Sequence, residues 1–295
     1  MGRCSRGLYF LSPALLFAVW GSNPSDAADG RIEINHQRAL AGSVTASDTA
    51  GYPVTLDAVG SYRLTSDLVS PDANTHGIEV LADDVTIDLN GFSISGPVTC
   101  TSFGVNLNCT PNGGVGDGVR SSKLNTTVMN GTVRGMGRTG VTANGVGGRV
   151  ENIHAIGNGL GGIQTVENGI VRGCNAERNA GAGIKADDNS QVTNNISYGN
   201  QSTGIEGPGV AILARGNSVQ FNGALGIRLR TNGLALDNII VYNTGFGLQV
   251  GDSAVLNPGG YGRNQINTNA GGTVGFYGSA NQVDANVCNG VVACP

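Results

Sequence analysis

A short repeat places the strongest constraint on how this chain of 295 residues can fold. A glycine followed by Ile, Leu or Val recurs at intervals of 41, 22, 22, 21, 21, 22 and 21 residues. An asparagine stands four residues before five of these glycines, so the asparagine and the glycine recur together at a fixed spacing. A period of this length predicts an array of stacked units that contact only their neighbours. The two series are Gly77, Gly118, Gly140, Gly162, Gly183, Gly204, Gly226 and Gly247, and Asn158, Asn179, Asn200, Asn222 and Asn243.

Each unit is expected to contain short strands separated by turns. Runs of alternating apolar and polar residues, such as Val85–Leu89, predict two or three strands of about three to five residues per unit. The chain has 49 glycines, and a glycine costs about 1 kcal/mol at a helical position, so a helical bundle is excluded. Collagen is excluded because glycine does not occupy every third position. The hydrophobic content of 39% and the net charge of -4 exclude a disordered chain.

The unit Asn-x-x-x-Gly-(Ile/Leu) resembles the parallel β-helix repeat of the right-handed, pectate-lyase-like superfamily over about residues 77–270. The segment Gly60–Thr65, followed by Asp84–Gly91, also resembles the first coils of exported bacterial β-helix proteins. The resemblance implies an all-β, right-handed parallel β-helix solenoid of about 8–10 coils of 21–22 residues. The superfamily includes lyases, hydrolases, epimerases and adhesins, so it implies a fold rather than one activity.

The ends of the chain lack the repeat. Residues 1–27 are predicted to be a signal peptide, because Arg3 and Arg6 precede the apolar stretch Leu8–Trp20 and small residues lead to Ala27. Cleavage after Gly21 and an uncleaved membrane anchor are the alternatives. Residues 28–76 are expected to form an N-terminal cap and first coil, residues 77–270 the β-helix with an insertion at about 97–114, and residues 271–295 a C-terminal cap or tail.

A secreted or periplasmic location is expected from the signal peptide, and no later segment is apolar enough to span a membrane. An oxidising compartment favours disulfides, and the cysteines lie in two close pairs, Cys100 with Cys109 and Cys288 with Cys294. Cys174 aligns with Ile153 of the preceding unit and is expected to be a buried thiol. The chain lacks the basic surface of a nucleic-acid-binding protein. A monomer is expected.

Aligned units place charged residues in columns on one face of the predicted solenoid. By the resemblance, Asp187 and Asp188 are candidate catalytic acid and base groups or calcium ligands. Arg228 and Arg230 would lie near an acidic polysaccharide as further catalytic candidates. A solubilising row of charges is the alternative. The candidate substrate-binding residues are Lys185, Glu206 and Glu167, and the outward column two residues after each glycine is Thr142, Gln164, Lys185, Glu206, Arg228 and Gln249.

Motifs of particular enzymes are missing from the sequence. The Asn-Thr-Asp and Gly-His-Gly elements of polygalacturonases and the Asp-Pro-His element of mannuronan epimerases do not occur. His36, His76 and His154 are isolated and are interpreted as surface or hydrogen-bonded residues. Phe221 and Phe246 are expected to plug the core.

Two functional hypotheses follow from these features. The first is an exported protein that binds or modifies an extracellular, acidic polysaccharide and, if it is an enzyme, resembles polysaccharide lyases or glycoside hydrolases. The second is a non-catalytic adhesin or scaffold of the cell surface.

Overall fold

The computed structural model describes residue 2 and residues 30–103, 106–251, 258–276, 280–291 and 294. Apart from residue 2, the predicted signal peptide lies outside the described residues. One short helix, α1 (His36–Ala41), begins after Asn35, whose side chain accepts a hydrogen bond from the Arg38 N–H. This helix packs against strand β4 at the N-terminal end of the solenoid. No helix in the described part of the chain is long and apolar enough to cross a membrane.

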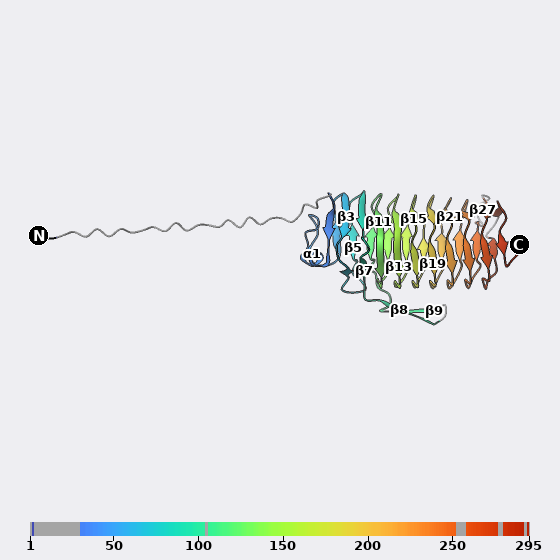
Figure 1. The fold of residues 1–295 in the computed structure, drawn as a ribbon, viewed down its shortest axis with the longest axis horizontal. Helices are drawn as coiled ribbons and strands as arrows, with labels where there is room; N and C mark the ends of the chain where they lie inside the picture. The colour runs from blue at the N-terminus through green and yellow to red at the C-terminus, as the bar shows by residue number, and fades with distance from the viewer. Residues whose placement is uncertain are drawn as a thin grey trace.

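The strands form three parallel stacks that run along the solenoid (Figure 1). The first stack contains ten strands, one for each coil, which confirms the predicted parallel β-helix and its number of coils. Its strands are β2 (Val54–Leu56), β5 (Ile78–Val80), β10 (Val119–Ser121), β12 (Val141–Ala143), β14 (Ile163–Thr165), β17 (Ile184–Lys185), β20 (Ile205–Gly207), β23 (Ile227–Leu229), β26 (Leu248–Val250) and β29 (Val274–Phe276).

The second and third stacks share two long strands, β11 (Thr127–Arg134) and β13 (Arg149–Ile156), whose first halves belong to the second stack and whose last halves belong to the third. The other strands of the second stack are β1 (Ile32–Ile34), β3 (Gly60–Leu64), β6 (Val85–Asp88), β15 (Ile170–Arg172), β18 (Gln191–Thr193), β21 (Leu213–Arg215), β24 (Leu234–Leu236), β27 (Gly259–Gly262) and β30 (Ala280–Gln282). Those of the third stack are β4 (Leu68–Val69), β7 (Ser93–Ser95), β16 (Asn175–Glu177), β19 (Ile196–Tyr198), β22 (Ser218–Gln220), β25 (Ile239–Val241), β28 (Gln265–Asn267) and β31 (Val287–Cys288).

Like residues of successive coils stack directly on one another. In the first stack, Ile163 pairs with Ile184, which pairs with Ile205, and all three side chains are buried. Neighbouring strands lie about 4.8 Å apart, so a column of equal side chains fills the narrow interior without gaps. The expected buried thiol is confirmed, because Cys174 lies inside this core.

The repeated asparagines form a buried ladder. Asn158 Nδ2 donates to Asn179 Oδ1 at 2.9 Å, and Asn179 Nδ2 donates to Asn200 Oδ1 at 2.9 Å. The same Oδ1 atoms also accept the backbone N–H of the preceding rung. A second ladder, which the sequence interpretation missed, runs parallel to it. Its members are Asn195, Asn217, Asn238, Asn264 and Asn286.

The insertion after β7 forms an antiparallel hairpin of β8 (Thr99–Phe103) and β9 (Asn106–Thr110). A disulfide joins Cys100 to Cys109 across this pair, and another joins Cys288 to Cys294. Figure 1 shows the hairpin outside the solenoid, alongside its axis.

The expectation that Phe221 and Phe246 plug the core is wrong, since their side chains are 40% and 37% exposed. Phe221 has a φ of 55°. It therefore sits at a corner between strands, whereas the inward strand positions already fill the interior.

Candidate functional site

The charged column predicted from the sequence lies on the outer face of the first stack. Strand register places Lys185 beside Glu206 and Glu206 beside Arg228. Glu206 Oε1 lies 3.8 Å from Arg228 Nη1, and a hollow of about 180 Å³ adjoins Lys185 and Glu206. Thr142 departs from the prediction, because it is only 2% exposed. It stands in register between the longer side chains of Arg120 and Gln164.

Asp187 and Asp188 lie at the corner that follows β17, and their carboxylates order the backbone there. Asp187 Oδ1 accepts the Asp188 N–H at 3.1 Å, and Asp188 Oδ1 accepts the Val210 N–H at 2.7 Å. Both oxygens abut Gly209. The Asp188 carboxylate thus joins two coils, whereas the Asp187 carboxylate bonds within its own coil. Their predicted acid, base or calcium-binding roles stay predictions.

Glu167 and Arg230 complete the predicted set. Glu167 is exposed, and Arg230 is half-buried without a side-chain hydrogen bond to any other described residue. The structure therefore brings together Lys185, Glu206 and Arg228, while the other candidates lie at corners beyond the strand ends.

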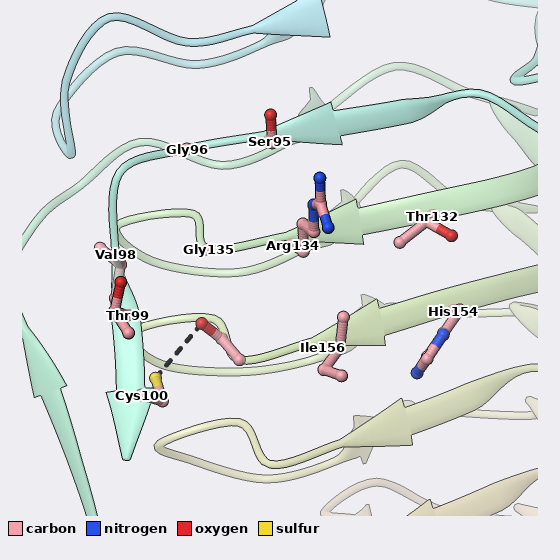
Figure 2. Close-up of a pocket in the computed structure, with 11 residues that line it drawn as sticks. Ser95, Gly96, Val98, Thr99, Cys100, Thr132, Arg134, Gly135, His154 and Ile156 are labelled. Carbon is pink, nitrogen blue, oxygen red and sulfur yellow. Dashed lines mark hydrogen bonds between the residues drawn. The ribbon is translucent and has the colours of Figure 1, made fainter. Parts of the chain in front are cut away.

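A larger cavity, of about 650 Å³, lies between the base of the hairpin and the third stack (Figure 2). Register places Thr132 of β11 beside His154 of β13, and Arg134 beside Ile156. Figure 2 shows Arg134 pointing toward Ser95 at the end of β7, whereas His154 points toward the following coil. We call this space the hairpin cavity. It is lined by Ser95 and Gly96 at the end of β7, by Val98, Thr99 and Cys100 at the start of the hairpin, and by Thr132, Arg134, Gly135, His154, Ile156 and Gly157 of the next two coils.

The hairpin cavity contains an arginine and a histidine whose side chains are available to contact a ligand. Arg134 is exposed and makes no ion pair with another described residue. His154 is 38% exposed, and its Nε2 atom lies 3.4 Å from Glu177 Oε2. Glu177 Oε1 in turn lies 3.1 Å from Arg178 Nη1. A carboxylate beside an imidazole can orient the ring.

The first part of the cavity wall is held rigidly. The Gly96 N–H donates to the Arg134 carbonyl at 2.9 Å, and the Val98 N–H donates to the Gly135 carbonyl at 2.8 Å. Gly135 has a φ of +62°, and a Cβ atom there would lie 2.7 Å from the Val98 carbonyl oxygen. Only glycine fits this position, so the wall approaches the solenoid closely because residue 135 has no side chain.

Arg134 was not predicted as a site residue, and His154 was interpreted only as a surface or hydrogen-bonded residue. Their positions relative to the neighbouring coil could have been found, since Thr132 and His154 are one repeat apart. The direction in which the inserted hairpin folds back could not, because it depends on contacts between segments distant in sequence.

Among the described residues, no group of three or more His, Cys, Asp or Glu side chains is placed to hold a metal ion. The described residues therefore assign no ligands to the calcium that the sequence interpretation left open.

The fold and the hairpin cavity define a parallel β-helix protein with a walled surface site. No protein-family model and no curated protein matches this sequence. Among solved structures, the chain is similar to the A-module of a mannuronan C-5 epimerase from Azotobacter vinelandii, with a TM-score of 0.54 and 16% identity over 84% of this chain and 70% of that chain. At this identity the likeness concerns the fold, and it confirms the β-helix resemblance.

Two further structures have lower TM-scores. A single-residue variant of a periplasmic alginate epimerase has a TM-score of 0.49 and 15% identity over 88% of this chain and 82% of that chain. The Dettilon tailspike protein has a TM-score of 0.44 and 14% identity over 73% of this chain and 41% of that chain.

Proposed function

We propose that this protein binds an acidic polysaccharide in the hairpin cavity. The observation that carries the proposal is the convergence of Arg134, His154 and several hydroxyl groups on one space of about 650 Å³. A guanidinium group forms paired, charge-assisted hydrogen bonds with a carboxylate. The hydroxyls of Ser95, Thr99 and Thr132 offer donors and acceptors to sugar hydroxyls.

A polymer fits the surroundings of the cavity better than a small molecule. The outer face of the third stack continues past the cavity, with Ile156, Glu177 and Tyr198 in register on successive coils. Such a row runs along the solenoid axis, so a chain anchored in the cavity can contact each coil in turn. The shared fold with a module of a mannuronan epimerase supports a uronate polymer.

His154 is the group best placed for chemistry on a bound sugar. Its imidazole lines the cavity beside Glu177, and an imidazole can act as a general acid or base. We propose proton transfer to or from a bound uronate as the reaction class, with His154 as the exchanging group and Arg134 binding the sugar carboxylate. A secreted or periplasmic site of action accords with the predicted signal peptide.

Binding is tested by calorimetry with alginate, pectate and a neutral dextran. The protein should bind a uronate polymer and not dextran, and Arg134→Ala should weaken that binding by about tenfold. The matched control is Arg172→Ala, because Arg172 is an exposed arginine of the second stack paired with Glu151. Equal weakening by both substitutions, or no binding of either uronate polymer, would refute the proposal.

Catalysis is tested separately, by following unsaturated products, new reducing ends and altered uronate stereochemistry. His154→Asn should abolish any such change while binding persists.

A second candidate function is a purely adhesive or scaffolding role. It is favoured by the use of one carboxylate oxygen of Asp187 and one of Asp188 for backbone hydrogen bonds, which is a structural role for these two residues. Binding of polymer with no chemical change by the unaltered protein would support this candidate.

A further inference from the structure

The hairpin supplies Thr99 and Cys100 to the wall of the hairpin cavity, and the support of this wall changes at Val98. Up to Val98 the wall is hydrogen-bonded to the solenoid through Gly96 and Val98. Beyond Val98, β8 pairs only with β9, in a two-stranded sheet separate from the three stacks. An isolated hairpin of two strands is marginally stable in water. The position of Thr99 and Cys100 in the cavity wall therefore depends on other contacts.

The buried side of β9 carries Leu107 and Cys109, each 8% exposed. A satellite cluster of Ala73, Val98 and Cys109 packs with the partly buried Cys100 and Ala180, apart from the main core. Cys100 Sγ lies 3.2 Å from the Gly157 carbonyl oxygen, the contact drawn as a dashed line in Figure 2. This sulfur carries no hydrogen while it is in a disulfide, so the contact is one of packing. Both cysteines of the disulfide thus belong to the small buried patch through which the hairpin contacts the solenoid.

We propose that the Cys100–Cys109 disulfide is a redox-controlled latch on the hairpin cavity. The oxidised hairpin completes the cavity wall, and an external dithiol releases the hairpin while the solenoid stays folded. In this reaction the S–S bond breaks, and the dithiol supplies two electrons and two protons to form two cysteine thiols. The dithiol becomes a disulfide. The consequence for ligand binding rests on the proposed function.

The solenoid has its own support, which does not involve these cysteines. Its strands pair in continuous parallel stacks, and the two asparagine ladders run inside it. Cys174 is buried, and burial raises the pKa of its thiol to about 12. It therefore stays protonated and unreactive near neutral pH. The Cys288–Cys294 disulfide lies at the C-terminal end of the solenoid and can be removed separately.

The test uses the full chain with Cys288→Ser and Cys294→Ser, which leaves one disulfide. Dithiothreitol is added, and alkylation with mass spectrometry verifies that Cys100 and Cys109 have become thiols. Hydrogen exchange in peptides from β8 and β9 should accelerate about tenfold, while exchange in β15 to β22 stays unchanged. Affinity for an alginate hexasaccharide should fall about tenfold. The variant Cys100→Ser with Cys109→Ser should behave like the reduced protein, and reoxidation should restore slow exchange.

Each other outcome decides against a named part of the proposal. Unchanged exchange in β8 and β9 after reduction overturns the latch, and so does faster exchange throughout the solenoid. Released strands with unchanged alginate affinity overturn its control of the cavity. Absence of alginate binding in both redox states refutes the proposed function, and the exchange result then decides the latch alone.

Discussion

Asn179 shows how single polar side chains can stabilise the interior of this solenoid. Its Oδ1 accepts both the backbone N–H and the Nδ2 of Asn158, at 3.1 and 2.9 Å. Its Nδ2 donates to Asn200 Oδ1 and to the Ala155 carbonyl, at 2.9 and 3.0 Å. The amide oxygen accepts two hydrogen bonds and the amide nitrogen donates two, so burial leaves no unpaired donor or acceptor. An aliphatic side chain would fill the space but leave backbone groups without partners.

Asn179→Ala should therefore destabilise the protein strongly. The Asn158 N–H and the Ala155 carbonyl lose a buried partner, and each such loss costs about 1–3 kcal/mol. We expect the free energy of unfolding to fall by about 3 kcal/mol in urea denaturation. Asn281→Ala is the control, because Asn281 is exposed, and should change the free energy by less than about 0.5 kcal/mol. Similar effects of the two substitutions would show that the ladder adds no stability.

His76 gives the solenoid a pH-dependent contact. Its Nδ1 accepts the Asp117 N–H at 2.8 Å, and Asp117 pairs with Arg138. Burial lowers the pKa of His76, although the Asp117 charge opposes this shift, with smaller effects from Arg120 and Glu79. A lowered pKa means that the folded protein favours the neutral imidazole. The stability that His76 provides is thus present above its ordinary pKa of 6.5 and is lost as the pH falls through that value toward the lower folded pKa.

His76→Asn should remove this part of the pH dependence. The asparagine carbonyl can still accept the Asp117 N–H but does not titrate between about pH 5 and 7. Urea denaturation at about pH 5 and about pH 7 should show that the unaltered protein loses more stability on acidification than the variant does. Equal losses in the two proteins would show that His76 does not contribute.

At the scale of strands and corners, neighbouring glycines have opposite requirements. A Cβ atom on Gly162 would lie 2.5 Å from the Gly183 carbonyl oxygen and 2.8 Å from Asn179 Nδ2. The neighbouring Gly161 has room for a Cβ atom, because the nearest atoms, on Ala182 and Thr139, would lie 3.6 Å from it, an ordinary van der Waals distance. The repeated glycine is therefore required because the next coil and the asparagine ladder pass directly over it.

Gly162→Ala should destabilise the protein by about 1–3 kcal/mol through overpacking between coils. Gly161→Ala should be neutral or stabilise by up to about 1 kcal/mol, because it restricts the unfolded chain without a clash. Thermal unfolding of the pair measures the difference. A Gly161→Ala protein as unstable as Gly162→Ala would contradict the specific requirement for glycine at position 162.

The same elements show what the sequence could and could not predict. The coil was predictable because stacking forces Gly162 and its counterparts into every unit at one phase. The second asparagine ladder was missed although Asn195 and Asn217 keep a similar spacing, because asparagines also occupy exposed turns beside it, such as Asn194 with a φ of 57°. The hairpin cavity was not predictable, since it depends on where an insertion packs. Aromatic corners such as Phe221 were misjudged because residue type alone does not distinguish a corner from an inward strand position.

At the scale of the whole molecule, the solenoid is a one-dimensional array. Every interior coil pairs with a coil on each side, whereas a terminal coil has one such neighbour. Helix α1 packs against β4 at the N-terminal end, and the Cys288–Cys294 disulfide closes the segment after β31 at the C-terminal end. In an array of this kind stability is a sum of coil and interface contributions, so it should fall toward the ends.

Native-state hydrogen exchange should therefore be slowest in the central strands β15 to β22 and faster in β30 and β31, because opening a terminal coil breaks one interface and opening a central coil breaks two. Replacing Cys288 and Cys294 with serine should accelerate exchange further in β31 and leave β15 unchanged, since coils contact only their neighbours. The local change serves as the internal control for the gradient. Equal exchange rates in central and terminal strands would mean that the ten coils open as one cooperative unit. The asparagine ladders would then be the first candidates for this long-range coupling, because they cross every interface between the coils they span.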